Sequence, residues 1–308
     1  MPKSKDTPLA IPGESMLPAI IHKKDTDAIF DVNENMTGVV PQVPKIEILR
    51  EGQMFRIVGD QQTFPKFSAV IVSHRAGRRY WKKAMGEGAN APPDCFSNNG
   101  LVGIPRTLED GSDLCPIPGH QRARNNERYK NQFICATCPM NAWGSDPKGG
   151  RGKGCKERHL LYLLPTDPDL ASIIPYLLDL PPSCLAAKDK YFTLLTTRGI
   201  PHAAIVTNLA LKKETNNAGQ EYSELMLQAD LKRRLSRNDQ LLIKGIIDTY
   251  QGAFDKASAD AMAAAETHTD AEQPEEQAPA APRAAKPQQQ QEEPHQPESD
   301  EGNLPIPF

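Results

Sequence analysis

The stretch Phe67-Ser-Ala-Val-Ile-Val72 constrains the fold more than any other part of this 308-residue chain. It is rich in β-branched residues and carries one hydroxyl side chain, which is typical of a buried strand. Alternating apolar and polar residues at 45–49 and 54–58 predict two strands before it, and residues 159–164 predict another after a long polar interval. The core is therefore expected to be built on β-sheet.

The second half of the body adds helices to this sheet. Residues 168–180 predict a short helix broken near Pro175, and Ser183 can cap a helix that ends near Gly199. A hairpin is predicted from strands at 203–213 and 221–231, and apolar spacing predicts an amphipathic helix over 236–257. The fold class is therefore α+β.

Composition divides the chain into a body and a tail. Residues 259–297 are nearly all Ala, Gln, Glu and Pro, which cannot build a core and predict a disordered linker before an acidic tip at 298–308. Residues 1–43 predict an irregular leader, and 44–258 the folded core. Within this core, residues 86–158 are rich in Gly, Pro and charge, and they predict a cysteine-rich insert that needs a source of order other than a core.

Charge follows the same division. Residues 259–308 contain eleven acidic and two basic residues, so the net charge of −3 for the whole chain leaves about +6 on the body. A basic body with an acidic tail is typical of a protein that binds polyanions. No apolar run approaches the ~18 residues of a membrane span, and the N-terminus lacks the apolar core of a signal peptide. A cytoplasmic protein with reduced thiols is predicted.

The insert contains five of the six cysteines, and their pattern predicts a metal site. A two-residue gap lets one tight turn supply two of the four thiolates that a tetrahedral zinc requires. Cys115 is an alternative to Cys95 as a ligand, and His120 or His159 is a weaker substitute. Cys184 lies on a predicted helix and is interpreted as a small buried hydrophobe. The preferred ligands are Cys95, Cys135, Cys138 and Cys155.

The predicted metal is zinc in a structural role. A site closed by four thiolates leaves no open position for catalysis. The same thiolates could hold an iron–sulfur cluster, which remains the alternative. The run Gly149 to Gly154 has the composition of a phosphate-binding loop but lacks its spacing, and no catalytic set of residues stands out. The protein is therefore predicted not to be an enzyme.

Two basic and aromatic segments predict a nucleic-acid interface. Aromatic rings that stack on bases, within a groove of cations, hold single strands with little dependence on sequence. The alternatives are that Tyr80 and Trp81 belong to the core, where one of two adjacent strand residues points inward, and that Trp143 packs on the cysteine knuckle. The predicted DNA-binding residues are Arg75, Arg78, Arg79, Tyr80, Trp81, Lys82 and Lys83 in the first segment, and Trp143, Arg151, Lys153 and Lys156 in the insert.

The end of the chain, Asp300-Glu-Gly-Asn-Leu-Pro-Ile-Pro-Phe308, resembles the acidic C-terminal tips of bacterial single-stranded DNA-binding proteins. The segment from Cys135 to His159 also resembles a class of phage- and prophage-encoded proteins thought to bind DNA. The resemblance implies an OB-fold, a five-stranded β-barrel, into which the cysteine-rich segment is inserted. It also implies that host replication and repair proteins bind the tip through Asp300, Glu301, Ile306, Pro307 and Phe308.

The expected function is therefore protection of single-stranded DNA in phage DNA replication or recombination, with recruitment of partners through the tip. A DNA-processing enzyme, such as an iron–sulfur nuclease or a primase-like zinc protein, is the alternative. A third hypothesis is an adaptor that binds a host replication protein and only incidentally binds DNA. The sequence leaves zinc against iron–sulfur, homo-oligomerisation and the size of the DNA site open.

Overall fold

The computed structural model describes residues 17, 42–49, 51–60, 62–82, 92–106, 117, 119–124, 127–128, 132–146, 149, 151–215 and 221–264. Most of the predicted leader, nearly all of the predicted linker, the acidic tip, Lys83 and Cys115 lie outside these residues.

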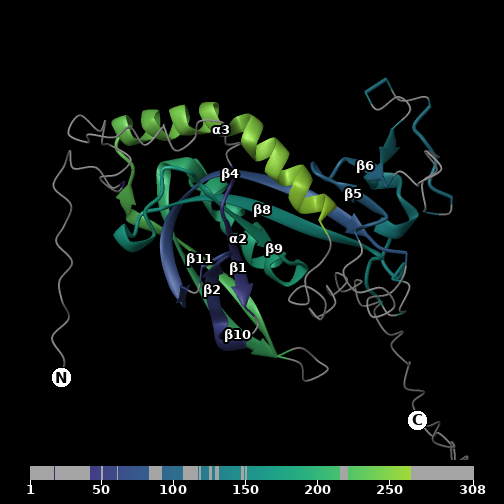
Figure 1. Ribbon diagram of the computed structural model, residues 1–308, viewed down its shortest axis with the longest axis horizontal. Coiled ribbons are helices and arrows are strands. Elements are labelled where there is room, and N and C mark those ends of the chain that lie inside the picture. Colours follow the sequence, from purple (N-terminus) through teal and green to yellow (C-terminus); the bar gives the residue numbers. More distant parts are fainter. Residues whose placement is uncertain are drawn as a thin grey trace, which may run out of the picture. The chain divides into compact units, whose positions relative to one another are not determined.

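The fold is a mixed α+β structure with one large sheet and two described helices (Figure 1). The strands are β1 Lys45–Leu49, β2 Met54–Ile57, β3 Thr63–Phe64, β4 Lys66–Tyr80, β5 Cys95–Ser97, β6 Val102–Pro105, β7 Phe133–Ile134, β8 Cys155–Pro165, β9 Tyr176–Leu180, β10 Ile205–Thr215 and β11 Glu221–Arg234. The helices are α2 Pro182–Thr197 and α3 Arg237–Ala263. Short 3-10 turns are η2 Glu51–Gln53, η3 Cys135–Thr137, η4 Pro139–Asn141, η5 Pro168–Leu170 and η6 His202–Ala204.

The main path through the sheet is β3-β2-β1-β9-β8-β4-β5-β6-β7, and β10 pairs with both β4 and β11. Strand β4 is 15 residues long and pairs with β8 from Ala69 to Tyr80. The predicted buried stretch 67–72 is its first half, which is confirmed. Both faces of the sheet are covered here, and this explains why the stretch is apolar without alternation.

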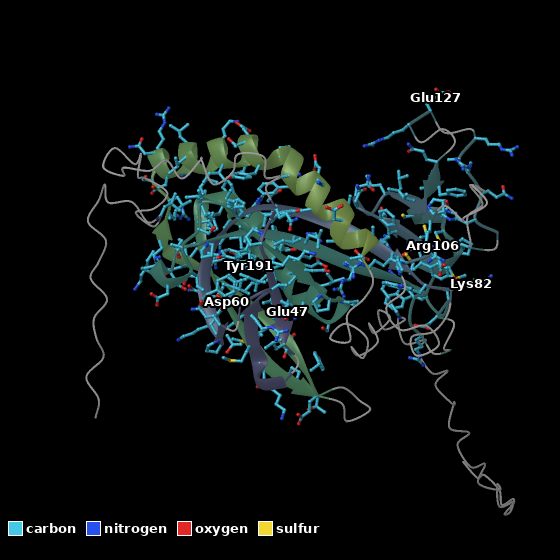
Figure 2. The ribbon with its side chains drawn as sticks, viewed as in Figure 1. Glu47, Asp60, Lys82, Arg106, Glu127 and Tyr191 are labelled. Atoms are coloured by element: carbon cyan, nitrogen blue, oxygen red, sulfur yellow. The ribbon has the colours of Figure 1, made fainter. Side chains whose placement is uncertain are left out.

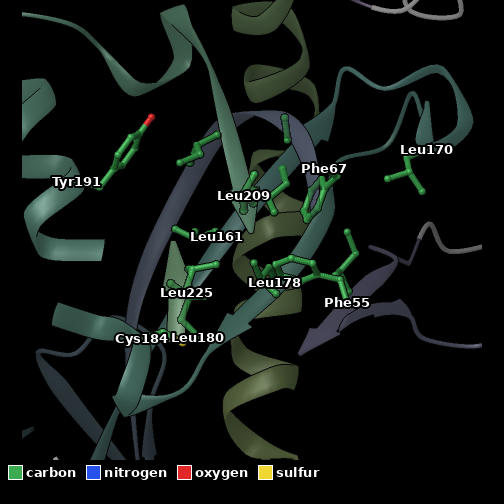
Figure 3. Close-up of a cluster of buried hydrophobic side chains, with 14 of the residues drawn as sticks. Phe55, Phe67, Leu161, Leu170, Leu178, Leu180, Cys184, Tyr191, Leu209 and Leu225 are labelled. Carbon is green, nitrogen blue, oxygen red and sulfur yellow. The ribbon is translucent and has the colours of Figure 1, made fainter. Parts of the chain in front are cut away.

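One face of the sheet encloses the first core, which includes Phe55, Phe67, Leu161, Leu178, Leu180, Cys184, Tyr191, Leu209 and Leu225 (Figure 3). The sheet curves around this core, because Ser223 Oγ on the edge strand β11 donates over 3.3 Å to the carbonyl of Leu49 at the end of β1. Among the described residues no strand pairing joins β11 to β1, so the sheet is open. A closed five-stranded OB barrel is therefore not confirmed.

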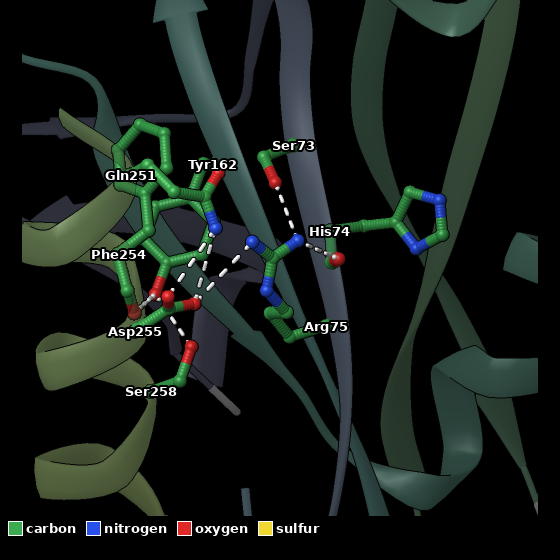
Figure 4. Close-up of polar contacts among 8 residues, drawn as sticks. All are labelled: Ser73, His74, Arg75, Tyr162, Gln251, Phe254, Asp255 and Ser258. Carbon is green, nitrogen blue, oxygen red and sulfur yellow. Dashed lines mark hydrogen bonds and ion pairs between the residues drawn. The ribbon is translucent and has the colours of Figure 1, made fainter. Parts of the chain in front are cut away.

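The other face carries the second core, which α3 covers. Ser236 caps this helix: its hydroxyl accepts from Asp239 N, and the Asp239 carboxylate accepts from Ser236 N, which forms a capping box. Tyr162 Oη, on β8, donates to Phe254 O at 2.6 Å and lies 2.8 Å from Ser258 Oγ, which anchors the middle of the helix to the sheet (Figure 4). The predicted helix is confirmed and continues to Ala263, past the predicted start of the linker.

The prediction for residues 168–180 was wrong. They form η5 followed by strand β9, which pairs with β8 and, in parallel, with β1. Pro175 lacks a backbone donor and disfavours helical geometry at the residue before it, so a helix cannot run through this point. Leu177, Leu178 and Leu180 then pack on both faces of the sheet, which fits a strand covered on both sides.

In the part of the chain that the structure describes, no helix is both long and apolar enough to cross a membrane.

Candidate nucleic-acid interface

The cysteine-rich insert leaves the sheet between β4 and β8, which pair directly with each other. We call residues 92–155 the cysteine module. Its strand β5 pairs with the last three residues of β4, so that Tyr80 is the register partner of Cys95 on one side and of Cys155 on the other. Register partners in an antiparallel pair point to the same face. These three side chains therefore form one row across the base of the module.

Four of the five predicted or alternative cysteine ligands in the insert lie in its described part, and all four are buried. Cys95, Cys138 and Cys155 pack in one apolar cluster with Tyr80 and Ile117. The knuckle forms the expected turn, because Cys138 N donates to Cys135 O at 3.3 Å and Asn141 N donates to Cys138 O at 2.9 Å. Burial raises the pKa of Cys135, and burial followed by the neighbouring Cys138 raises that of Cys155 to about 12. The thiols form an apolar cluster in this arrangement.

The described side chains do not form a metal-binding group. No three His, Cys, Asp or Glu residues among them lie close enough together to hold an ion. The row at the base of the module gives one reason. Tyr80 separates Cys95 from Cys155 by two strand spacings, about 10 Å between Cα atoms. Thiolates that share a zinc each lie about 2.3 Å from it, so Cys95 and Cys155 fit one site poorly.

The substitutes for Cys95 differ in their surroundings. Cys115 lies outside the described residues. The Nε2 atom of His120 is 3.1 Å from Ile134 O, and its ring lies against Phe133. His159 belongs to a different cluster, with His74 and Lys188. Cys184 is fully buried in the first core, which confirms its interpretation as a small hydrophobe.

Several predicted DNA-binding residues of β4 are structural. Tyr80 is 3% exposed in the cysteine cluster, and Arg79 is 3% exposed beneath α3. Arg79 Nη2 lies 2.9 Å from Asp179 Oδ2 and donates to Ala261 O at 2.6 Å. Both predicted DNA-binding side chains are therefore buried in this structure. They alternate along the strand, so Tyr80 enters the cysteine cluster and Arg79 enters the layer beneath α3.

Arg75 and Arg78 serve as connections between layers. Arg75 donates to Ser73 Oγ and His74 O at 2.8 and 2.9 Å and reaches Asp255 of α3 at 3.4 Å (Figure 4). Arg78 points to the opposite face, where it donates to Asn141 Oδ1 and to Gly100 O. Its side chain is 16% exposed and joins the cysteine module to β4.

The residues that follow β4 are more accessible. Trp81 is half-buried, and Lys82 is exposed at the end of the molecule that also carries Arg106 (Figure 2). The backbone amide of Lys82 donates to Asp94 Oδ2 at 2.7 Å, which leaves its ammonium group on the surface. Lys83 lies outside the described residues. This part of the predicted segment is therefore the part that can reach a ligand.

Within the module, one aromatic residue lies on the surface among cations. Trp143 is 37% exposed, and Lys153 Nζ lies 4.7 Å from the centroid of its ring. Arg151 is exposed two residues away from Lys153. Lys156 instead pairs with Asp146 at 2.5 Å. The core alternative for Trp143 does not hold, and Trp143 with Arg151 and Lys153 forms a surface that could stack on a base and hold phosphates.

A buried polar relay escaped the sequence analysis. Lys188 Nζ on α2 lies 3.2 Å from His159 Nδ1, and His159 Nε2 lies 3.1 Å from His74 Nδ1. A lysine ammonium has only donors, so His159 accepts at Nδ1 and donates from Nε2 to His74. Burial, then the neighbouring charges, lowers the pKa of His74 to about 4 and that of His159 to about 3. Three separate elements supply these residues, and no local pattern in the sequence joins them.

A buried ion cluster was also missed. Asp179 on β9 accepts from Arg158 Nε and Nη2 at 3.1 and 3.0 Å and pairs with Arg79. Burial alone would raise the pKa of Asp179, but the two guanidinium groups outweigh it and hold the pKa below its usual value. Arg79 and Arg158 are 3% and 2% exposed. The cluster binds β4, β8 and β9 to each other, and Arg79 extends it to α3.

Comparisons with protein-family models, with curated proteins and with solved structures find no match to this chain.

Proposed function

We propose that this protein binds single-stranded DNA without catalysis and that the cysteine module supplies the contact surface. The observation that carries the proposal is the exposed Trp143 with Lys153 beside its ring and Arg151 nearby. Indole stacking on an unpaired base, with cations on the adjacent phosphates, is the usual means of binding single strands without sequence preference. Lys82, exposed at the end of β4 from which the module begins, would add a further cation for the strand.

The cysteines have a supporting role in this proposal. Cys135, Cys138 and Cys155 would hold a structural zinc, or an iron–sulfur cluster, together with a fourth thiolate, and for this their side chains would have to move closer together than they lie in the described arrangement. Cys115 suits this position better than Cys95, because Tyr80 lies between Cys95 and Cys155 in the sheet. Bound metal would supply order to an insert that has few strand pairings of its own. Elemental analysis of the purified protein tests this part directly.

The rest of the proposal concerns setting and partners. The curved sheet around the first core would serve as an OB-like scaffold for the module, although its strands remain open. The acidic tip, with Asp300, Glu301 and Ile306-Pro-Phe308, would recruit cytoplasmic replication and repair proteins of the host during phage DNA replication or recombination. The tip lies outside the described residues, so the sequence alone supports this part.

Fluorescence titration with labelled dT oligomers and with duplex of the same length tests the DNA-binding function. Trp143→Ala should weaken binding to dT by about 5- to 150-fold, equivalent to roughly 1–3 kcal/mol for a stacked base. Lys213→Ala is a suitable control, because Lys213 is exposed on β10 and forms an ion pair with Glu221 of β11. Equal affinity for duplex and single strand, or unchanged affinity in a folded Trp143→Ala protein, would contradict the proposal. Cleavage of the oligomers would favour the nuclease alternative.

A further inference from the structure

Strand β11 contains a bulge that carries a dense group of cations. Between the register pairs Thr207↔Ala229 and Ile205↔Arg234, β10 advances by two residues while β11 advances by five. The extra residues form a bulge just before α3 begins. Bulges re-aim side chains away from the regular ladder and are frequent next to functional sites. We call Lys232, Arg233, Arg234 and Arg237 the cationic bulge.

The charges of this group are free to meet a ligand. Lys232, Arg234 and Arg237 are exposed, and half-buried Arg233 donates from Nη2 to Thr166 Oγ1 at 3.3 Å. Throughout the described part of the chain, no carboxylate forms an ion pair with any of the four. Lys212 and Lys213, on the same hairpin, differ from this group because both form ion pairs with glutamates.

The nearest carboxylates have structural roles. Asp230 accepts from the amide of Lys232 at 3.1 Å, and Asp239 is 1% exposed in the capping box of α3. Asp167, beside Thr166, accepts from Ser68 N at 2.9 Å. The N-terminus of α3 adds its partial positive charge at the same place. Asp230 keeps its charge and offsets one cation, so the surface stays net positive with four cations in six residues.

Three of the four cations are arginines, which favours a phosphate ligand. A guanidinium presents a planar fork of donors that matches phosphate oxygens, and it remains charged at any physiological pH. The group lacks an exposed aromatic anchor of the kind that dominates protein interfaces. Phosphodiester groups of a nucleic acid are therefore a better fit than an acidic protein.

Helix α3 relates this surface to the cysteine module. Its first residue is Arg237, and its last turn contacts the end of β4, where Ala261 O accepts from Arg79 and Met262 packs on Gly77. Arg79 is the register partner of Phe96 on β5, the first strand of the module. A helix of 27 residues spans about 40 Å. The cationic bulge and the module thus lie at opposite ends of α3 (Figure 1).

We propose that the cationic bulge is a second contact for the phosphate backbone of the same single strand that the cysteine module binds. This inference rests on the proposed function. A strand stacked as in duplex carries one phosphate per 3.4 Å, so about 12 nucleotides cover 40 Å. Oligomers shorter than this reach both surfaces only if they stretch beyond the stacked spacing, whereas longer ones engage both without stretching. The second contact is then intramolecular and raises affinity without any new interaction at the module.

The test uses the full-length protein with dT oligomers of 8, 12, 20 and 30 nucleotides at several salt concentrations. The variant Lys232→Gln/Arg234→Gln/Arg237→Gln keeps Arg233, which contacts Thr166. The expected result is unchanged affinity for dT8, at least tenfold weaker binding of dT30, and a salt slope smaller by about 2, at 0.7 per phosphate contact. The matched control, Lys212→Gln/Lys213→Gln/Lys244→Gln, removes three cations that all have acidic partners and should bind like the wild type.

The possible outcomes distinguish failure of the second contact from failure of the proposed DNA-binding function. If the wild type binds dT30 and the variant matches it at every length, the second contact does not exist. Equal losses for dT8 and dT30 would also overturn it, because the bulge would then act on the first contact. Binding to polyglutamate is measured in parallel. If the variant binds every oligomer like the wild type but no longer binds polyglutamate, the surface belongs to an acidic protein and the inference is wrong. Failure of the wild type to bind any oligomer would overturn the proposed function itself.

Discussion

Asp179→Asn is expected to be among the most destabilising single changes in the sheet. The substitution keeps the shape of the side chain but removes the charge that neutralises Arg79 and Arg158. Both guanidinium groups are nearly fully buried and the Asp179 side chain is 25% exposed, so water can replace the carboxylate only in part. Removing one partner from a buried ion pair costs about 3–5 kcal/mol, because an uncompensated charge remains. In a fold of this size, that loss corresponds to a fall in Tm of roughly 6–20 °C.

Urea and thermal unfolding followed by circular dichroism at pH 7 measure this effect. Asp248→Asn is the control, because Asp248 and its partner Lys244 are 63% and 69% exposed on α3, where such a pair contributes about 1 kcal/mol or less. Hydrogen exchange adds a second measurement. Arg79→Met should increase exchange in the last turn of α3, since Arg79 donates to Ala261 O.

The refuting result is specific. If Asp179→Asn unfolds within 1 kcal/mol of the wild type with the same urea dependence, the two guanidinium groups have access to another anion or to water. The cluster would then not hold β4, β8 and β9 together, and the account of why Arg79 is unavailable to DNA would be wrong.

Two further predictions concern the buried His74–His159 relay and the packing of the end of α3 on Gly77. The pKa values of His74 and His159 lie near 4 and 3 in the folded protein and near 6.5 in the unfolded chain. The stability that the two neutral histidines contribute is therefore complete above pH 6.5 and is lost as pH falls below it. The free energy of unfolding should drop by up to about 1.4 kcal/mol per pH unit for each histidine between pH 6 and 5, and a His74→Gln protein with an unchanged slope would contradict this. In Gly77→Ala the new methyl carbon would lie 2.3 Å from Met262 Sδ, so we expect a loss of about 1–3 kcal/mol in chemical unfolding. The same change in a Met262→Ala background should cost clearly less, and equal costs would show that Met262 is not the obstacle.

The fold was predictable where local pattern and burial agree. The stretch 67–72, the hairpin of β10 and β11 and the amphipathic α3 all follow from residue type and spacing. Strand β4 was predicted too short, because Arg75 to Arg79 is polar and looks like the end of a strand. These arginines are accommodated by partners distant in the sequence, with Asp179 100 residues from Arg79 and Asp255 180 residues from Arg75.

The candidate site shows the same limit. The Cys135–Cys138 turn could be read from its two-residue gap, and the gathering of buried cysteines at the base of the insert followed from it. The position of Tyr80 between Cys95 and Cys155 depends on strand register, which the sequence does not encode locally. Trp143 lies in irregular structure, so no periodicity could show that it faces solvent. The sequence analysis did not single out the cationic bulge, because its shape depends on the pairing of β11 with β10.

The pairing of Tyr80 with Cys155 has a consequence for how this chain could have been assembled. Strands β4 and β8 form a complete hairpin without residues 81–154, since these two residues already face each other across the ladder. A turn of two residues is enough to join antiparallel strands at such a point. The insert can therefore be gained, exchanged or lost as a unit while the first hydrophobic core keeps its contacts, and the second core would lose only the packing of Phe96. A chain of this design can acquire a new binding surface by a single insertion, independently of the scaffold that carries it.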